Sequence, residues 1–176
     1  MEIYKLTKKN RESIKLEIES GAVFIYPTDT VYGIGCNALD SAAVRKIKEI
    51  KQRETPLSII APSKEWIIEN CEAKSNQLKK LPGHYTLIFK LKNKNAVASE
   101  VSKETIGVRI PDHEISSLIK ELGFPVITTS ANLRGDSPMS EIKKLKGVDF
   151  AIDEGKIAGT PSTIIDLTGK IPKRLR

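Results

Sequence analysis

AVFIYPTDTVYGIG, residues 22–35, sets an apolar run directly before a polar one. Residues 22–26 are all apolar or aromatic, which is typical of a strand buried on both faces of a sheet. The Pro-Thr-Asp-Thr segment that follows offers hydroxyls and one carboxylate, and Gly33 and Gly35 let a ligand approach the backbone closely. We therefore expect an α/β fold with a polar, ligand-facing loop where this strand ends.

Strand-like and helix-like segments alternate along the rest of the chain, without a repeat or an evident linker. This pattern predicts one α/β domain, residues 1–176, with a twisted sheet of mixed parallel and antiparallel strands flanked by helices. Helices are expected at 10–20, from a cap at Asp40 to about 51, 63–70, 75–81, 111–123 and 140–146, and further strands at 57–61, 85–91, 105–110, 124–130, 149–153 and 162–167.

The composition limits the class of protein. Hydrophobic residues make up 39% and charged residues 29%, as in globular proteins with a packed core. No apolar run reaches the roughly 18 residues of a membrane span, and the N-terminus lacks an apolar signal core, so we expect a cytoplasmic protein without a membrane partner. Cys36 and Cys71 have neither the spacing nor the His neighbours of a metal site, so we expect two reduced thiols and no protein-bound metal.

The chain is basic, with 29 Lys and Arg against 22 Asp and Glu, a net charge of +7. This excess favours an anionic partner such as a nucleotide, phosphate or RNA. A solvated lysine-rich surface explains the same excess equally well.

The loops PTDTVYG, TTSAN and TPST share small hydroxyl residues beside other small residues. Ligands of open α/β sheets bind in the crevice at strand ends, so we expect these loops to converge there. Turn chemistry explains any one of them alone, and the chain contains neither GxGxxG nor GxxxxGK[ST].

Three cations stand at informative places. Lys51 and Arg53, in KQR at a helix end, could clamp phosphates or could simply complement the helix dipole. Arg109 lies in the otherwise apolar strand GVRI, so its charge requires a partner, either a ligand carboxylate or phosphate or a structural carboxylate such as Asp29 or Asp112.

The remaining titratable candidates have less specific settings. Asp29 could orient Thr28 or Thr30, help to hold Mg²⁺, or close its own loop. His84 follows a Pro-Gly turn and His113 begins a helix, so structural roles are expected for both. Without an activated nucleophile, the pattern favours chemistry by positioning and charge neutralisation.

PTDTVYGIG, KQR before PL, PGHYT, GVRIPDH, TSAN and STIIDL follow one another in the order found in the YrdC-like family. The chain resembles this family over about residues 10–176, in its short, single-domain form. The resemblance implies a twisted mixed sheet around a concave basic cavity. It also implies a threonylcarbamoyl-adenylate synthase, which makes threonylcarbamoyl-AMP and pyrophosphate from L-threonine, bicarbonate and ATP with Mg²⁺. The product would pass to a tRNA threonylcarbamoyl-transferase complex, which modifies the adenosine beside the anticodon.

The resemblance also implies roles for residues at matching positions. Lys51 and Arg53 would be catalytic, and Tyr32 and Gly33 would shape the wall of the amino-acid site. L-Threonine would contact Thr28, Arg109, Thr128 and Ser162, and ATP would contact Lys51, Arg53, Thr105, Ser130, Asn132, Ser137 and Arg176.

The sequence departs from the common family pattern in KQRETPL, which is about two residues tighter, in TTSAN and in PGHYT. The alternative is a paralogue without synthase activity that binds tRNA or double-stranded RNA through its positive charge. A carbamoyl-transfer domain is a third possibility, but it usually belongs to much longer chains.

Overall fold

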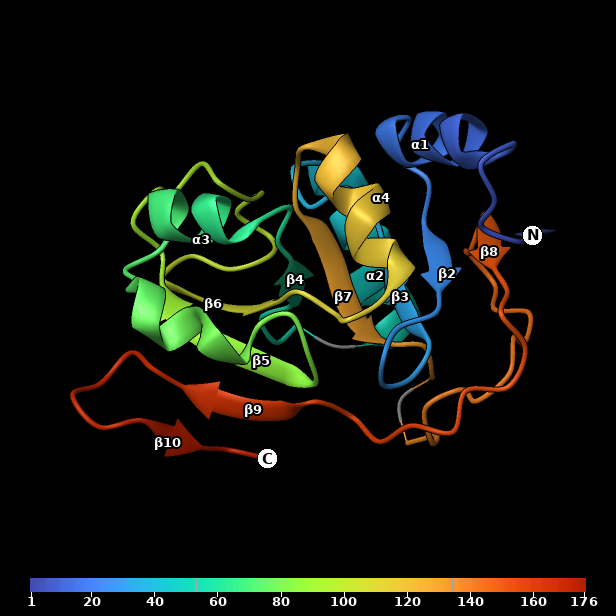
Figure 1. Ribbon diagram of the computed structural model, residues 1–176. Helices are drawn as coiled ribbons and strands as arrows, with labels where there is room; N and C mark the ends of the chain where they lie inside the picture. The colour runs from blue at the N-terminus through green and yellow to red at the C-terminus, as the bar shows by residue number, and fades with distance from the viewer. Residues whose placement is uncertain (53, 134) are drawn as a thin grey trace.

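The strands of the computed structural model, which describes residues 1–52, 54–133 and 135–176, form one mixed sheet (Figure 1). Their order is β1-β8-β2-β3-β7-β4-β6-β5-β9-β10, with both parallel and antiparallel neighbours. The predicted mixed α/β sheet is therefore confirmed. The strands are β1 (Glu2–Tyr4), β2 (Phe24–Tyr26), β3 (Gly33–Gly35), β4 (Ser58–Ile60), β5 (Tyr85–Lys90), β6 (Thr105–Arg109), β7 (Val126–Ser130), β8 (Phe150–Ile152), β9 (Thr163–Asp166) and β10 (Lys173–Arg174).

Helices cover both faces of the sheet (Figure 1). They are α1 (Arg11–Glu19), α2 (Ser41–Lys51), α3 (Lys64–Asn70), α4 (Glu114–Leu122) and a 3₁₀ helix, η1 (Ser75–Lys80). The apolar faces of α1 and α4 pack with Phe24, Tyr26 and Phe150 on one side. Those of α2, α3 and η1 pack with Ile25, Ile34 and the alternate strand residues on the other. None of the helices in the described residues is long and apolar enough to cross a membrane.

The helix boundaries follow from local capping. Asp40 accepts hydrogen bonds from the backbone N–H groups of Ala42 and Ala43 and so begins α2, as expected. The predicted start of α4 at residue 111 was wrong, because the helix begins at Glu114 with the His113 imidazole as its N-cap. Gly123, in the left-handed conformation, ends α4 as expected.

The polar loop that follows β2 is a hairpin connection. The segment Gly33–Gly35 forms β3 and pairs antiparallel with β2, where we had expected only loop. Glycine usually weakens a strand, but at Gly35 the missing side chain lets β3 lie close to the backbone of β7. A Cβ on Gly35 would lie 2.1 Å from the carbonyl oxygen of Ile127. The hairpin therefore returns the chain to the sheet after residues 27–32.

Other expectations at the edges were wrong or missing. Residues 140–146 form no helix, although Ile142 and Leu145 do pack against the core. A segment so short gains little from helix formation after its nucleation cost, and tertiary packing decides its shape. The short edge strands β1 and β10 were not predicted at all.

Candidate functional site

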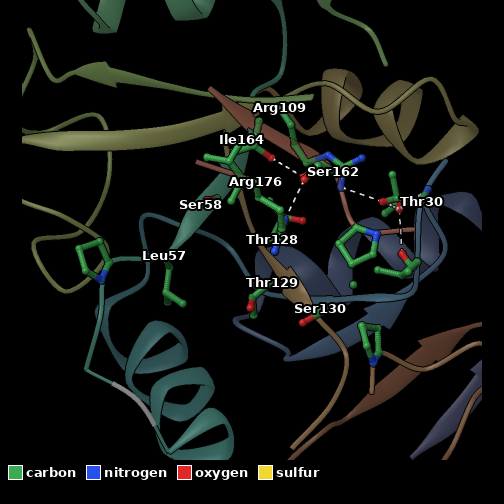
Figure 2. A pocket seen from close by; sticks show the side chains of 17 residues that line it. Thr30, Leu57, Ser58, Arg109, Thr128, Thr129, Ser130, Ser162, Ile164 and Arg176 are labelled. Atoms are coloured by element: carbon green, nitrogen blue, oxygen red, sulfur yellow. Dashed lines mark hydrogen bonds between the residues drawn. The ribbon is translucent and has the colours of Figure 1, made fainter. Parts of the chain in front are cut away.

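The three polar loops meet around a cavity of about 260 Å³, here called the inner cavity (Figure 2). The hairpin loop supplies Thr28 and Thr30, and β6 ends in it with Arg109. Other parts of its wall come from the start of β4, from β5 and β7, from the start of β9 and from the C-terminus. The predicted convergence of these loops is thus confirmed. The expected residues that line the inner cavity are Thr28, Gly33, Arg109, Thr128, Ser130, Ser162 and Arg176.

Arg109 is the buried charge of the inner cavity, with only 6% of its surface exposed. Its Nη2 lies 2.5 Å from Asp29 Oδ1, and its Nη1 donates to Thr30 Oγ1 at 3.1 Å. Burial lowers the pKa of the guanidinium, and the nearby Asp29 carboxylate opposes this shift. Within residues 1–52, 54–133 and 135–176, Arg109 Nε has no hydrogen-bond partner. The structural partner considered from the sequence is therefore present, because Asp29 takes one end of the fork, and Arg109 also lines the inner cavity.

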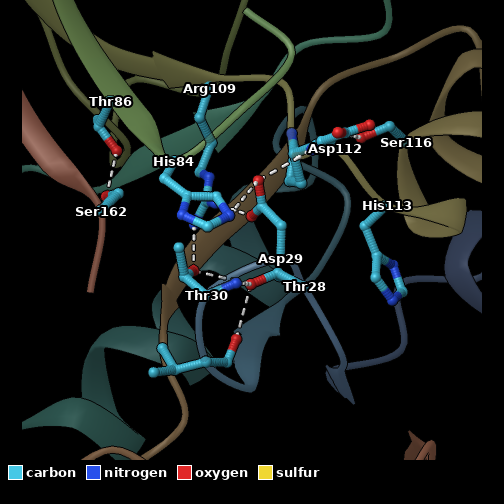
Figure 3. Close-up of polar contacts among 12 residues, drawn as sticks. Thr28, Asp29, Thr30, His84, Thr86, Arg109, Asp112, His113, Ser116 and Ser162 are labelled. Carbon is cyan, nitrogen blue, oxygen red and sulfur yellow. Dashed lines mark hydrogen bonds and ion pairs between the residues drawn. The ribbon is translucent and has the colours of Figure 1, made fainter. Parts of the chain in front are cut away.

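Asp29 joins two segments of the chain (Figure 3). Its Oδ1 binds Arg109, its Oδ2 accepts the backbone N–H of Asp112 at 2.9 Å, and His84 Nε2 lies 3.8 Å from the same oxygen. The carboxylate is thus used inside the protein. In the part of the chain that the structure describes, no group of three His, Cys, Asp or Glu side chains could hold a metal ion.

The hydroxyls of the hairpin loop form a relay that ends on the backbone (Figure 3). Thr30 accepts from Arg109 and bonds Thr28 Oγ1 at 2.9 Å, while Thr28 donates to the carbonyl of Val31 at 2.8 Å. The turn chemistry weighed from the sequence is therefore present. It fixes the loop against Arg109 while Thr28 still lines the inner cavity.

On the opposite wall, Ser162 and Thr86 share a hydroxyl hydrogen bond of 2.8 Å. Arg176 Nε donates to the carbonyl of Ser162 at 3.0 Å, and the Arg176 carbonyl accepts from Ile164. The β9–β10 hairpin thus brings the C-terminal arginine to the inner cavity. Thr86 was not expected from the sequence, although alternation along β5 places it on the face of Arg109.

A second cavity of about 740 Å³, the outer cavity, lies beside the end of α2. Lys48, Lys51 and Asn132 line it, and Ser130 belongs to both the inner and the outer cavity. Lys51 Nζ donates to the carbonyls of Ser130 and Asn132 and to Asn132 Oδ1 at 2.6–2.7 Å. Arg53, expected to act with Lys51, lies outside the described residues, and Ser137 is exposed and lines neither cavity.

Thr105, expected on the nucleotide, lies in a third cavity of about 380 Å³ at the other end of β6, which we call the β6-start cavity. This cavity shares Pro56 with the inner cavity, and Lys48 and Glu54 with the outer one. The three therefore adjoin one another, and the predicted site residues divide between them.

The two histidines line none of these three cavities. His113 Nδ1 accepts the N–H of Ile115, so Nε2 carries the proton and donates to Glu154 at 2.9 Å.

Tyr32 does not line the inner cavity, and its hydroxyl instead bonds the chain at 153–155. That segment leads to Gly159, where a Cβ would lie 1.7 Å from the carbonyl oxygen of Thr30.

Comparison with known proteins gives one consistent result. A family profile described as "Telomere recombination", covering Sua5, YciO and YrdC, matches residues 17–176. The chain is 45% identical over 184 residues to the putative threonylcarbamoyl-AMP synthase of Methanocaldococcus jannaschii, covering 95% of this chain and 86% of that protein. It is 33% identical over 173 residues to the threonylcarbamoyl-AMP synthase of Haemophilus influenzae strain PittEE, covering 90% and 94%.

The fold comparison agrees. The structure of P. abyssi Sua5 complexed with L-threonine superposes with a TM-score of 0.86 at 30% identity. The match covers 99% of this chain but 56% of that one, so the chain spans little more than half of the Sua5 protein. The chain belongs to the Sua5/YciO/YrdC family.

Proposed function

We propose that this chain is a threonylcarbamoyl-AMP synthase that makes threonylcarbamoyl-AMP and pyrophosphate from L-threonine, bicarbonate and ATP. The observation that carries the proposal is Arg109, a buried cation that lines the inner cavity and whose Nε has no partner among the described residues. The inner cavity is smaller than the roughly 300–1,000 Å³ of pockets for drug-sized ligands, which suits a small amino acid. The structure of P. abyssi Sua5 in complex with L-threonine supports the same substrate.

In this proposal the threonine carboxylate binds Arg109 Nε, where a charge-assisted hydrogen bond satisfies the buried donor. Thr128 and the Thr86–Ser162 hydroxyl pair line the rest of the amino-acid site. ATP lies across the outer and β6-start cavities, with its phosphates near Lys51, Ser130 and Asn132 and its nucleoside toward Thr105. Arg53, Ser137 and Arg176 are further expected contacts of ATP.

The chemistry requires positioning and no covalent intermediate on the protein. The threonine amine adds to bicarbonate and water leaves, which gives a carbamate. A carbamate oxygen then attacks the α-phosphorus of ATP in line, the bond to the β-phosphate oxygen breaks, and pyrophosphate leaves. The positive charges of Lys51, Arg53 and Arg176 would stabilise the charge that develops.

Mg²⁺ would neutralise charge on the phosphate oxygens of ATP. Asp29, the carboxylate considered for Mg²⁺ from the sequence, is already bound to Arg109 and to the backbone N–H of Asp112. The metal would therefore be held by the phosphates of ATP and arrive with the nucleotide. We further propose one domain over residues 1–176, a cytoplasmic location, and transfer of the product to a tRNA threonylcarbamoyl-transferase complex.

Pyrophosphate release tests the proposal directly. Purified protein with Mg²⁺ and ATP should release pyrophosphate only when both L-threonine and bicarbonate are present, and threonylcarbamoyl-AMP should appear in equal amount. Release at the level of reactions without threonine would refute it.

The net charge of +7 and the exposed Lys143, Lys144 and Lys146 favour a second candidate, binding of tRNA or double-stranded RNA. Such binding should weaken with salt, with a log–log slope of about −0.7 to −0.9 per phosphate neutralised. A flat salt response would exclude it.

A further inference from the structure

Lys51 occupies an unusual place for a cation expected to contact phosphate. It is the last residue of α2 and is only 4% exposed. Its Nζ lies 2.7 Å from the Ser130 carbonyl, 2.6 Å from the Asn132 carbonyl and 2.7 Å from Asn132 Oδ1. An ammonium has three N–H donors, and three such short bonds to the loop after β7 engage all of them.

Asn132 makes this loop a connected unit. Its Oδ1 also accepts from Ser130 Oγ at 2.6 Å, and its Nδ2 donates to the carbonyls of Leu133 at 3.1 Å and Asp136 at 2.7 Å. Lys51 therefore binds the residue on which the hydrogen bonds of the loop converge. Moving the ammonium toward a ligand would break bonds on both sides of Ala131.

The same loop forms the wall between the inner and the outer cavity, since Ser130 lines both and Asn132 lines the outer one. The position of this loop thus determines the surface that a phosphate group meets in the outer cavity. The three hydrogen bonds of Lys51 hold this surface in place, and they would have to break before its ammonium could contact a phosphate directly.

We propose that Lys51 is a positioning residue, which holds Ser130, Asn132 and Asp136 of this loop in the arrangement that binds the triphosphate of ATP. This inference rests on the proposed function in assigning the triphosphate to the outer cavity. The charge of Lys51 attracts the phosphates through space, while its three N–H groups bind the loop. The resemblance to the family had suggested a direct contact instead.

The test compares the loop with and without Lys51 in protein free of nucleotide. Amide hydrogen exchange is followed at Asn132, Asp136 and Met139, whose N–H groups bond within residues 130–139. Lys51→Met keeps the apolar stem but removes the ammonium, and exchange at these amides should become at least about tenfold faster as the loop opens locally. A residue that only contacts phosphate would leave these rates unchanged.

Lys48→Met is the matched control. Lys48 lies in the same helix and lines the same cavity, but its Nζ contacts Glu54, at 3.5 Å from the carbonyl and 3.8 Å from the carboxylate. This variant removes the same charge from the outer cavity and should leave the exchange of the three amides at the wild-type rate. Faster exchange in both variants, or in neither, would overturn the proposal.

Lys51→Arg separates charge from hydrogen bonding, because a planar guanidinium cannot reproduce three bonds to oxygens grouped around one nitrogen. It should exchange fast at the loop and bind ATP at least about tenfold more weakly despite its charge. Wild-type exchange and affinity in this variant would contradict the proposal.

If the Lys51 variants fail to fold, Asn132→Ala keeps the lysine charge and removes one of the three oxygens that the ammonium binds, together with the loop bonds of the amide. It should show fast loop exchange and weakened ATP binding, and unchanged exchange would overturn the inference. If wild-type protein releases no pyrophosphate, the proposed function fails, whereas the exchange data on nucleotide-free protein still decide whether Lys51 holds the loop.

Discussion

Arg109→Lys separates the two tasks of the buried guanidinium. Arg109 neutralises Asp29 through Nη2, whereas its Nε has no partner among the described residues. Arg109→Met would leave a buried carboxylate uncompensated and cost about 3–5 kcal/mol of stability. Lysine keeps a positive charge opposite Asp29 and loses Nε, so it tests the ligand contact without removing that compensation.

The expected loss is one hydrogen bond between charged groups, worth about 1.5–3 kcal/mol. At about 1.4 kcal/mol per factor of ten, the Kd for L-threonine should rise about 10- to 150-fold. The affinity for ATP should change much less, because the outer and β6-start cavities are lined by other residues.

Calorimetry with L-threonine and L-threoninamide assigns this loss to the carboxylate. Wild-type protein should prefer threonine, because the amide lacks the negative charge that Nε would bind. In Arg109→Lys this preference should shrink by most of the same factor. An equal preference in wild type and variant would refute the assignment of Nε to the carboxylate.

Gly159→Ala should weaken threonine binding and lower the free energy of unfolding by about 1–3 kcal/mol, because the new Cβ would collide with the carbonyl of Thr30; calorimetry and denaturant titration measure the two effects. Tyr32→Phe removes the hydroxyl that binds Asp153, Glu154 and Gly155, and should cost about 1–2 kcal/mol and speed proteolysis between 153 and 161. Arg11→Met should lower Tm at pH 7 and less so in acid, because the hydrogen bond from Arg11 lowers the pKa of Glu121 below its usual 4.5. A carboxyl whose pKa is lower in the folded state contributes stability above its unfolded pKa and loses it as pH falls through the folded value.

One of these predictions has a matched control variant, and each has an outcome that would contradict it. Ala158→Ser, at an exposed position beside Gly159, should leave threonine affinity and stability near wild type. Wild-type threonine affinity in Gly159→Ala would show that this contact does not shape the cavity, and wild-type proteolysis of Tyr32→Phe would show that the hydroxyl does not hold the segment. A Tm difference for Arg11→Met that is constant from pH 7 to pH 3 would rule out the ion pair as its cause.

The sequence was informative where a residue conflicts with its surroundings. Arg109 in an apolar strand indicated a buried charge with a partner, and the hydroxyl loops indicated a shared crevice. Neither depends on knowing which strands are neighbours.

It was uninformative where tertiary contacts decide. Gly33–Gly35 has low strand propensity and forms β3 only because β2 and β7 pair with it on either side. The three bonds of Lys51 are made to residues about 80 positions away, so the sequence near it could suggest a phosphate clamp but not a loop holder.

Strand β6 has a further consequence for which ligands fit. It carries Thr105 at one end, in the β6-start cavity, and Arg109 at the other, in the inner cavity. Four residue steps at about 3.3 Å each separate these ends by about 13 Å. Because β4 and β5 pair with β6 on its two sides, this length is fixed by the ladder and does not change when the surrounding loops move. In the proposed reaction, the strand would therefore fix the distance between the end of the amino-acid site at Arg109 and the end of the nucleotide site at Thr105.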